Sequence, residues 1–204
     1  MGVITNISVQ QKHKDRVNLY IDNEFYMGVS VELVYKFALK KGMEVDNAFI
    51  DEIVAENEKS EALSKAIAYT TKNLKTEKQV KTYLFGKEYQ PRTVFYVIDK
   101  LKEYKLIDDE VYSKRYLELN SGKQGERMSR YKLKAKGIKE EDINAACDQV
   151  DVDFIESAKN VAEKHLKNKP LTKENLSKTY RYLLGKGFSY EQVNSVMENF
   201  KVED

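Results

Sequence analysis

The chain has 204 residues, of which 41% are hydrophobic and 33% charged, with two prolines and a formal net charge of +2. This composition favours helices, and the high charge indicates several small helical units rather than one large dry core. No run of about eighteen apolar residues is present and the N-terminus lacks a secretion signal, which predicts a cytoplasmic protein without a membrane span. A single cysteine, Cys147, excludes an internal disulfide and suits a reducing compartment.

The N-terminal residues alternate between apolar and polar side chains. Residues 3 to 29 follow the period of two that is typical of β-strands. A polar stretch at 12 to 15 and the pair Asp22-Asn23 have the composition of turns, so they divide this segment into three strands. The pattern predicts a small antiparallel meander, which must pack on other elements to be stable.

Two helices are expected after the strands. Ser30 is placed to cap a helix over Val31 to Lys41, which would stop at Gly42. A short acidic helix is expected from about Asn47 to Asn57. Together with the meander, these helices predict an N-terminal unit over residues 1–57.

From Lys59 onward the apolar residues recur at the helical period, and one short phrase occurs three times. The copies begin at Leu84, Leu133 and Leu183, about fifty residues apart. Each copy has a leucine, a lysine three positions later, an apolar residue at the turn and another apolar residue five positions on. This pattern is typical of a helix end, a chain reversal and a new amphipathic helix.

The recurrence predicts a mainly α protein with three tandem three-helix repeats. The expected boundaries are 58–107, 108–150 and 151–204, and such repeats stack into an elongated curved array. Capping residues support the helix starts: Thr76 with Gln79 and Ser189 with Gln192 have the spacing of capping boxes. Pro91 suits the first turn of a helix, where its missing N–H costs nothing.

Charge is segregated along the middle repeat. Residues 123–139 carry seven basic residues and one acid, whereas residues 140–156 carry seven acids and no lysine or arginine. Three cations would point outward together on a helix from about Gln124 to Lys136, beside a docking stripe of apolar side chains. The cations are Arg127, Arg130 and Lys134, and the stripe consists of Met128, Tyr131 and Ala135.

Convergent cations of this kind bind phosphates or carboxylates, arginine doing so with two hydrogen bonds. The candidate binding residues are Arg127, Arg130, Lys132, Lys134, Lys136, Lys123, Arg115, Arg92 and Lys81. Two other interpretations stay open, an ordinary solvated basic face or internal pairing with the acidic residues 140–156. For the basic residues of the first repeat, a solvated face explains the charges as well as binding does.

The sequence carries no pattern of a catalytic or metal site. The segment GKQG at 122–125 lacks the spacing of a phosphate-binding loop, and we expect it to act as a flexible hinge. His13 and His165 form no ligand pattern with Cys147, which is expected to be a small core residue. We therefore predict no cofactor, no metal and no enzymatic activity.

Four phrases, in order along nearly the whole chain, resemble the RecX family of bacterial regulators. They are ITNISVQ with RVNLYID at the N-terminus, LKEYKLIDDEVYSKRY at 101–116, GKQGERMSRYKLKAKGI at 122–138 and YRYLLGKGFSYEQV at 180–193. The resemblance implies tandem three-helix repeats and a non-enzymatic monomer. It also implies binding in the groove of the RecA nucleoprotein filament, with contacts to RecA and DNA and modulation, usually inhibition, of ATPase, strand exchange and coprotease activities.

Two rival functions remain at this point. A stand-alone, sequence-nonspecific DNA-binding protein would bind through phosphates without any need for RecA. A helical-repeat scaffold for an unrelated protein would bind neither RecA nor its filament. The sequence does not decide whether the basic residues contact DNA, RecA or their own acidic neighbours.

Overall fold

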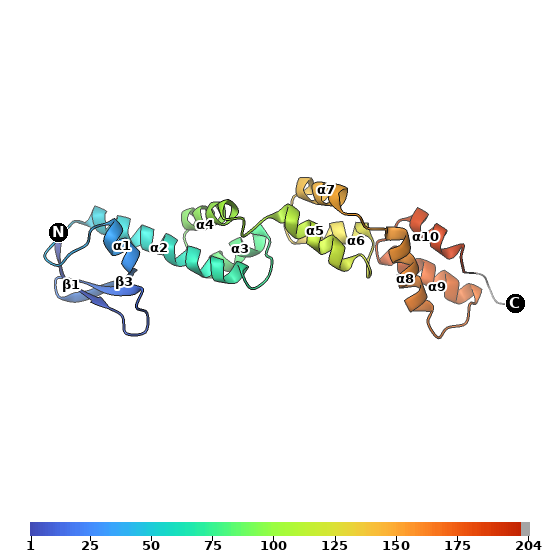
Figure 1. The fold of residues 1–204 in the computed structure, drawn as a ribbon, viewed down its shortest axis with the longest axis horizontal. Coiled ribbons are helices and arrows are strands. Elements are labelled where there is room, and N and C mark those ends of the chain that lie inside the picture. The colour runs from blue at the N-terminus through green and yellow to red at the C-terminus, as the bar shows by residue number, and fades with distance from the viewer. Residues whose placement is uncertain (201–204) are drawn as a thin grey trace. The chain divides into compact units, whose positions relative to one another are not determined.

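The computed structural model describes residues 1–200, and an antiparallel sheet precedes a series of helices (Figure 1). The predicted meander is confirmed by β1 (Gly2–Val9), β2 (Arg16–Ile21) and β3 (Glu24–Ser30). Asp22 and Asn23 form the expected tight turn, both with positive φ. A fourth strand, β4 (Glu44–Val45), was not predicted, and it pairs with β1 to give the order β3-β2-β1-β4.

The first helix, α1, covers Val31–Lys36, and the Leu33 amide donates to the hydroxyl of its N-cap Ser30 at 3.2 Å. The expected continuation to Lys41 is wrong, because Ala38 adopts a φ of 48° and reverses the chain. This reversal buries Leu39 against the sheet residues Ile4 and Leu19. The early end of α1 therefore allows Leu39 to pack into the N-terminal core.

Helix α2 is a single helix over Asn47–Thr70, begun by the N-cap Asp46. The sequence predicted two helices here, with a boundary between residues 57 and 58, and that expectation is wrong. The polar stretch between them is stabilised by ion pairs along the helix, including Lys59 with Glu56 at 2.6 Å. Ile53 near one end packs on the sheet, while Ala62 and Ala66 are fully buried.

The remaining helices follow the predicted repeats. Their bounds are α3 Glu77–Phe85, α4 Pro91–Glu103, α5 Asp109–Asn120, α6 Glu126–Ala135, α7 Glu140–Gln149, α8 Phe154–Leu166, α9 Lys173–Gly185 and α10 Tyr190–Met197. Both predicted capping boxes form, and Pro91 lies in the first turn of α4. None of the helices within residues 1–200 is both long and apolar enough to cross a membrane.

The recurring phrase has the same conformation in all three copies. Leu84, Leu133 and Leu183 are fully buried at a helix end. The residue four positions later has positive φ in each copy: Glu88 at 63°, Gly137 at 85° and Gly187 at 89°. The three copies therefore share one backbone geometry, since even Glu88 adopts the conformation that favours glycine.

The described chain divides into two compact units. The first contains residues 1–72 and 81–106, and the second contains residues 73–80 and the chain from Ile107 onward. Inside the second unit, the Thr76 hydroxyl donates to the carbonyl of Lys136 at 3.1 Å, and the Gly125 amide donates to the carbonyl of Lys186 at 3.0 Å. In both cases the turn of one repeat docks on the start of the middle helix of the repeat before it.

Candidate nucleic-acid interface

Helix α6 carries four of the nine predicted binding residues, but it docks through a different face than expected. Its buried side chains are Ser129 and Leu133, whereas Tyr131 is 69% exposed and Met128 is half-buried. The predicted apolar stripe is therefore wrong. Ser129 can be buried because its hydroxyl is hydrogen-bonded, accepting from the Gln124 side chain at 2.9 Å.

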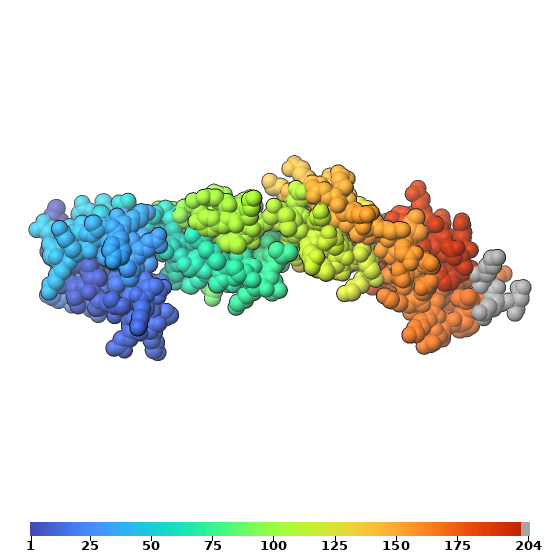
Figure 2. Space-filling view, viewed as in Figure 1, coloured from blue at the N-terminus to red at the C-terminus, as the bar shows by residue number. Residues whose placement is uncertain are grey.

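The segment GKQG before α6 is not a hinge throughout. Gly122 lies in open space, but Gly125 is buried and its amide is bound to Lys186. A Cβ on Gly125 would lie 2.3 Å from the carbonyl oxygen of Gly187, so the two repeats meet backbone to backbone. In the space-filling view, α5–α7 and α8–α10 accordingly meet as a continuous surface (Figure 2).

Two of the predicted cations are engaged within the molecule. Arg130 donates from Nε to Glu126 at 2.6 Å and from Nη1 to the Asn144 side chain at 2.6 Å. Glu140 lies 3.6 Å from Arg130 and also pairs with Lys134. Internal pairing with the acidic segment, one of the interpretations left open, thus holds for these two side chains.

Arg127 differs from Arg130. Its side chain is exposed and has no hydrogen bond or ion pair with another residue in the described part of the chain. It borders a surface cavity of about 340 Å³ that Tyr131 and Leu184 also line. The Arg127 guanidinium therefore lies beside an apolar surface cavity and is available to bind an external anion.

Lys132 of α6 and Lys136, the C-cap residue of the same helix, have weaker internal contacts. Lys132 donates to the Gln124 side chain at 2.5 Å. The Lys136 ammonium lies 5.8 Å from the centre of the Tyr112 ring, a cation–π distance. Both contacts are to neutral groups, so neither neutralises the positive charge of the lysine.

The remaining candidates have different local surroundings, each described within its own unit. Arg115 lies 3.6 Å from Glu118 on α5. In the first unit, the Lys81 ammonium lies 5.0 Å from the centre of the Phe95 ring, and Arg92 is exposed in the first turn of α4. Lys123 is exposed in the turn between α5 and α6 and faces a different group of residues, which the sequence did not single out.

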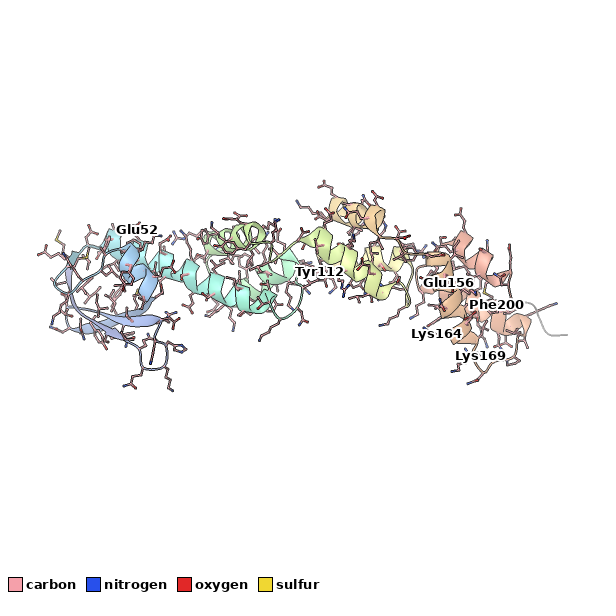
Figure 3. The ribbon with its side chains drawn as sticks, viewed as in Figure 1. Glu52, Tyr112, Glu156, Lys164, Lys169 and Phe200 are labelled. Atoms are coloured by element: carbon pink, nitrogen blue, oxygen red, sulfur yellow. The ribbon has the colours of Figure 1, made fainter. Side chains whose placement is uncertain are left out.

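That group surrounds a surface cavity of about 570 Å³ in the second unit, which we call the lysine cavity. Its lining includes Lys123, Lys164, Lys167, Lys169 and Lys186, together with His165 and Tyr182. Lys164 and Lys169 lie at and just beyond the C-terminal end of α8, away from Glu156 near its start (Figure 3). The lysines at 164–169 are close together in the sequence and could have been singled out as a basic segment. Their convergence with Lys123 and Lys186 depends on the fold.

A small sheet followed by tandem three-helix repeats with cationic surfaces defines a helical-repeat binding protein. The family model described as "Regulatory protein RecX N-terminal domain" matches residues 2–46, and "RecX, third three-helix domain" matches residues 151–197. Regulatory protein RecX of Clostridium tetani is 38% identical over 98% of this chain and 95% of its own length. The chain therefore belongs to the RecX family of regulatory proteins, which are not enzymes.

Other relatives agree with this assignment. Regulatory protein RecX of Bacillus subtilis is 30% identical over 100% of this chain and 79% of its own length. A solved structure described as "Crystal structure of regulatory protein RecX" has a TM-score of 0.79 at 27% identity, covering 98% of this chain and all of that one. These likenesses confirm the predicted fold class, mainly helical with an N-terminal antiparallel sheet.

Proposed function

We propose that this protein binds the RecA nucleoprotein filament as a monomer in the bacterial cytoplasm and inhibits its ATPase, recombinase and coprotease activities. The observation that carries the proposal is membership of the RecX family along the whole chain, at 38% identity to the Clostridium tetani relative. Cations without internal carboxylate partners, such as Arg127 and Lys123, support a polyanionic partner.

The proposed mechanism is adhesion. Exposed cations of α6 and the adjoining turn bind phosphates of the filament DNA or acidic groups on RecA. Exposed carboxylates near the start of α7, such as Glu141, are available for basic groups on RecA. A chain that bridges neighbouring RecA subunits hinders their relative motion, and this slows ATP hydrolysis and excludes a second DNA strand.

The alternative is a stand-alone DNA-binding protein, which the lysine cavity favours because its charges need no RecA to attract phosphates. Gel-shift titrations with bare single-stranded DNA and with preformed RecA filaments on the same DNA separate the two functions. The proposal predicts clearly tighter binding to the filament. Equal affinity for bare DNA would reject it in favour of the alternative.

A further inference from the structure

Five lysines from three separate segments converge on the lysine cavity. Lys123 comes from the turn before α6, Lys186 caps the end of α9, and the other three, Lys164, Lys167 and Lys169, lie at the end of α8 and just beyond it. The lining contains no aspartate or glutamate. Within residues 1–200, none of the five forms an ion pair. Their charges are therefore not neutralised inside the protein.

Helix ends explain only part of this charge. The C-termini of α8 and α9 both lie at the cavity, and basic residues there interact favourably with the partial negative charge of the carbonyl groups. Each end contributes about half a negative charge, so two ends offset about one of the five ammonium groups. The remaining positive charges repel one another in the free protein, and binding of an external anion reduces this repulsion.

One wall of the cavity is held rigid. The rings of His165 and Tyr182 are stacked, with centroids 4.3 Å apart and planes inclined by 14°. The Thr179 hydroxyl donates to the Asn175 carbonyl at 2.8 Å, so its oxygen accepts from Nδ1–H of His165 at 3.0 Å. Nε2 of His165 is then the acceptor for Lys169 at 3.3 Å. This network positions the Lys169 ammonium at the edge of the ring pair.

The same wall positions a second lysine. The Lys186 ammonium lies 5.2 Å from the centre of the Tyr182 ring, a cation–π distance. Because Tyr182 is stacked on His165, both ring contacts order the lysines without neutralising them. The cavity thus has two ammonium groups held by rings and three on exposed, adaptable side chains.

We propose that the lysine cavity binds the phosphodiester backbone of single-stranded DNA. Several separated ammonium groups suit a chain of phosphates, because lysine acts as a point charge and tolerates varied phosphate positions. An acidic peptide is the other polyanion to consider, but the lining has no arginine for bidentate carboxylate binding and no exposed large aliphatic side chain. The inference deepens the proposed function, since it rests on DNA being a partner and names where the chain contacts it.

The test measures anisotropy of a fluorescein-labelled oligothymidylate titrated with the full chain, without RecA. In the variant Lys164→Gln with Lys167→Gln, we expect affinity at low salt to fall roughly tenfold. The slope of log affinity against log salt should decrease by about 1.4, because each lost phosphate contact on a single strand contributes about 0.7. A second pair, Lys123→Gln with Lys169→Gln, should behave alike, and thermal melting checks that each variant is folded.

The matched control is Lys159→Gln with Lys178→Gln. These lysines are in the same repeat but do not line the cavity, and they pair with Glu156 at 3.7 Å and Glu174 at 2.6 Å. Because the change in net charge is the same, retained binding in the control supports a local site. Equal losses in control and cavity variants, or no loss in either cavity variant, would overturn the proposal.

Two further measurements test whether the cavity selects phosphates and whether the chain regulates RecA. If polyglutamate displaces the oligonucleotide as effectively as unlabelled oligothymidylate does, the cavity is not specific for phosphates and the proposal is rejected. RecA filament ATPase is measured with the same variants in a separate assay. Failure of the chain to affect that ATPase would count against the proposed function alone, since the DNA titration contains no RecA.

Discussion

Gly125 and Gly187 face each other so closely that neither position has room for a side chain. A Cβ on Gly187 would lie 2.4 Å from the Met128 amide nitrogen, and Gly187 has a φ of 89°. The contact joins the start of α6 to the turn between α9 and α10. Two adjacent repeats of the second unit therefore depend on paired glycines for their docking.

Replacing Gly187 tests this contact. We expect Gly187→Ala to lower the free energy of unfolding by at least about 2 kcal/mol, because it combines left-handed strain with a backbone clash. Thermal or urea unfolding measures the effect. The control is Gly185→Ala, whose Cβ would meet nothing within 4 Å and which should leave stability unchanged or slightly raised. Similar destabilisation by both variants would contradict the assigned contact.

Substitutions of the two arginines of α6 should affect different properties: Arg130→Ala the stability of the fold, and Arg127→Ala the inhibition of RecA. Arg130→Ala removes hydrogen bonds to Glu126 and Asn144 and should cost about 1 kcal/mol of unfolding free energy. Arg127→Ala removes no internal bond, so the melting temperature should not change, while inhibition of RecA ATPase should weaken. If Arg127→Ala inhibits as well as the wild type, Arg127 is not a binding residue.

The sequence predicted the repeats well because their signals are local. Leu133, Gly137 and Ile138 specify a helix end, a reversal and an anchor within six residues, and the structure places them accordingly. Strand β4 was missed because two residues, Glu44 and Val45, carry no periodicity; pairing with β1 creates the strand. The length of α2 was missed because its middle is polar and depends on ion pairs and tertiary packing.

The candidate interface was less predictable than the fold. A helical projection places Tyr131 and Arg130 on given faces, but it does not say which face is buried, and here the small residue Ser129 faces inward. Glu140 is ten residues from Arg130 and reaches it only because α7 folds back beside α6. The lysine cavity joins segments more than sixty residues apart, so only tertiary structure reveals it.

The thiol of Cys147 should be unreactive in the folded protein. Burial raises its pKa to about 11, so little thiolate is present at neutral pH. We expect alkylation by iodoacetamide at neutral pH to be more than about a hundredfold slower in the native chain than in urea, where the pKa returns to about 8.5. Equal rates in both conditions would show that Cys147 is not shielded as the structure describes.

His165 should make the stability of the second unit dependent on pH. Burial and the neighbouring Lys169 lower its pKa, so folding favours the neutral ring. The contribution of the neutral His165 ring to the free energy of unfolding is complete above the unfolded pKa of about 6.5. It is lost as the pH falls below that value toward the folded pKa. We expect the melting temperature to decrease on acidification from about pH 7.5 to 5.5, and less so in His165→Gln. An identical pH dependence in that variant would contradict the assignment.

The central claim, regulation of RecA, is tested most directly by titrating the chain into RecA filaments on single-stranded DNA while ATP hydrolysis is recorded. The measurement is made at about 0.05 and 0.2 M salt, because phosphate and carboxylate contacts weaken with ionic strength. We predict that hydrolysis falls with added protein, more steeply at low salt, and less with Arg127→Ala. An ATPase rate that stays unchanged at a saturating concentration of the wild-type chain would contradict the claim.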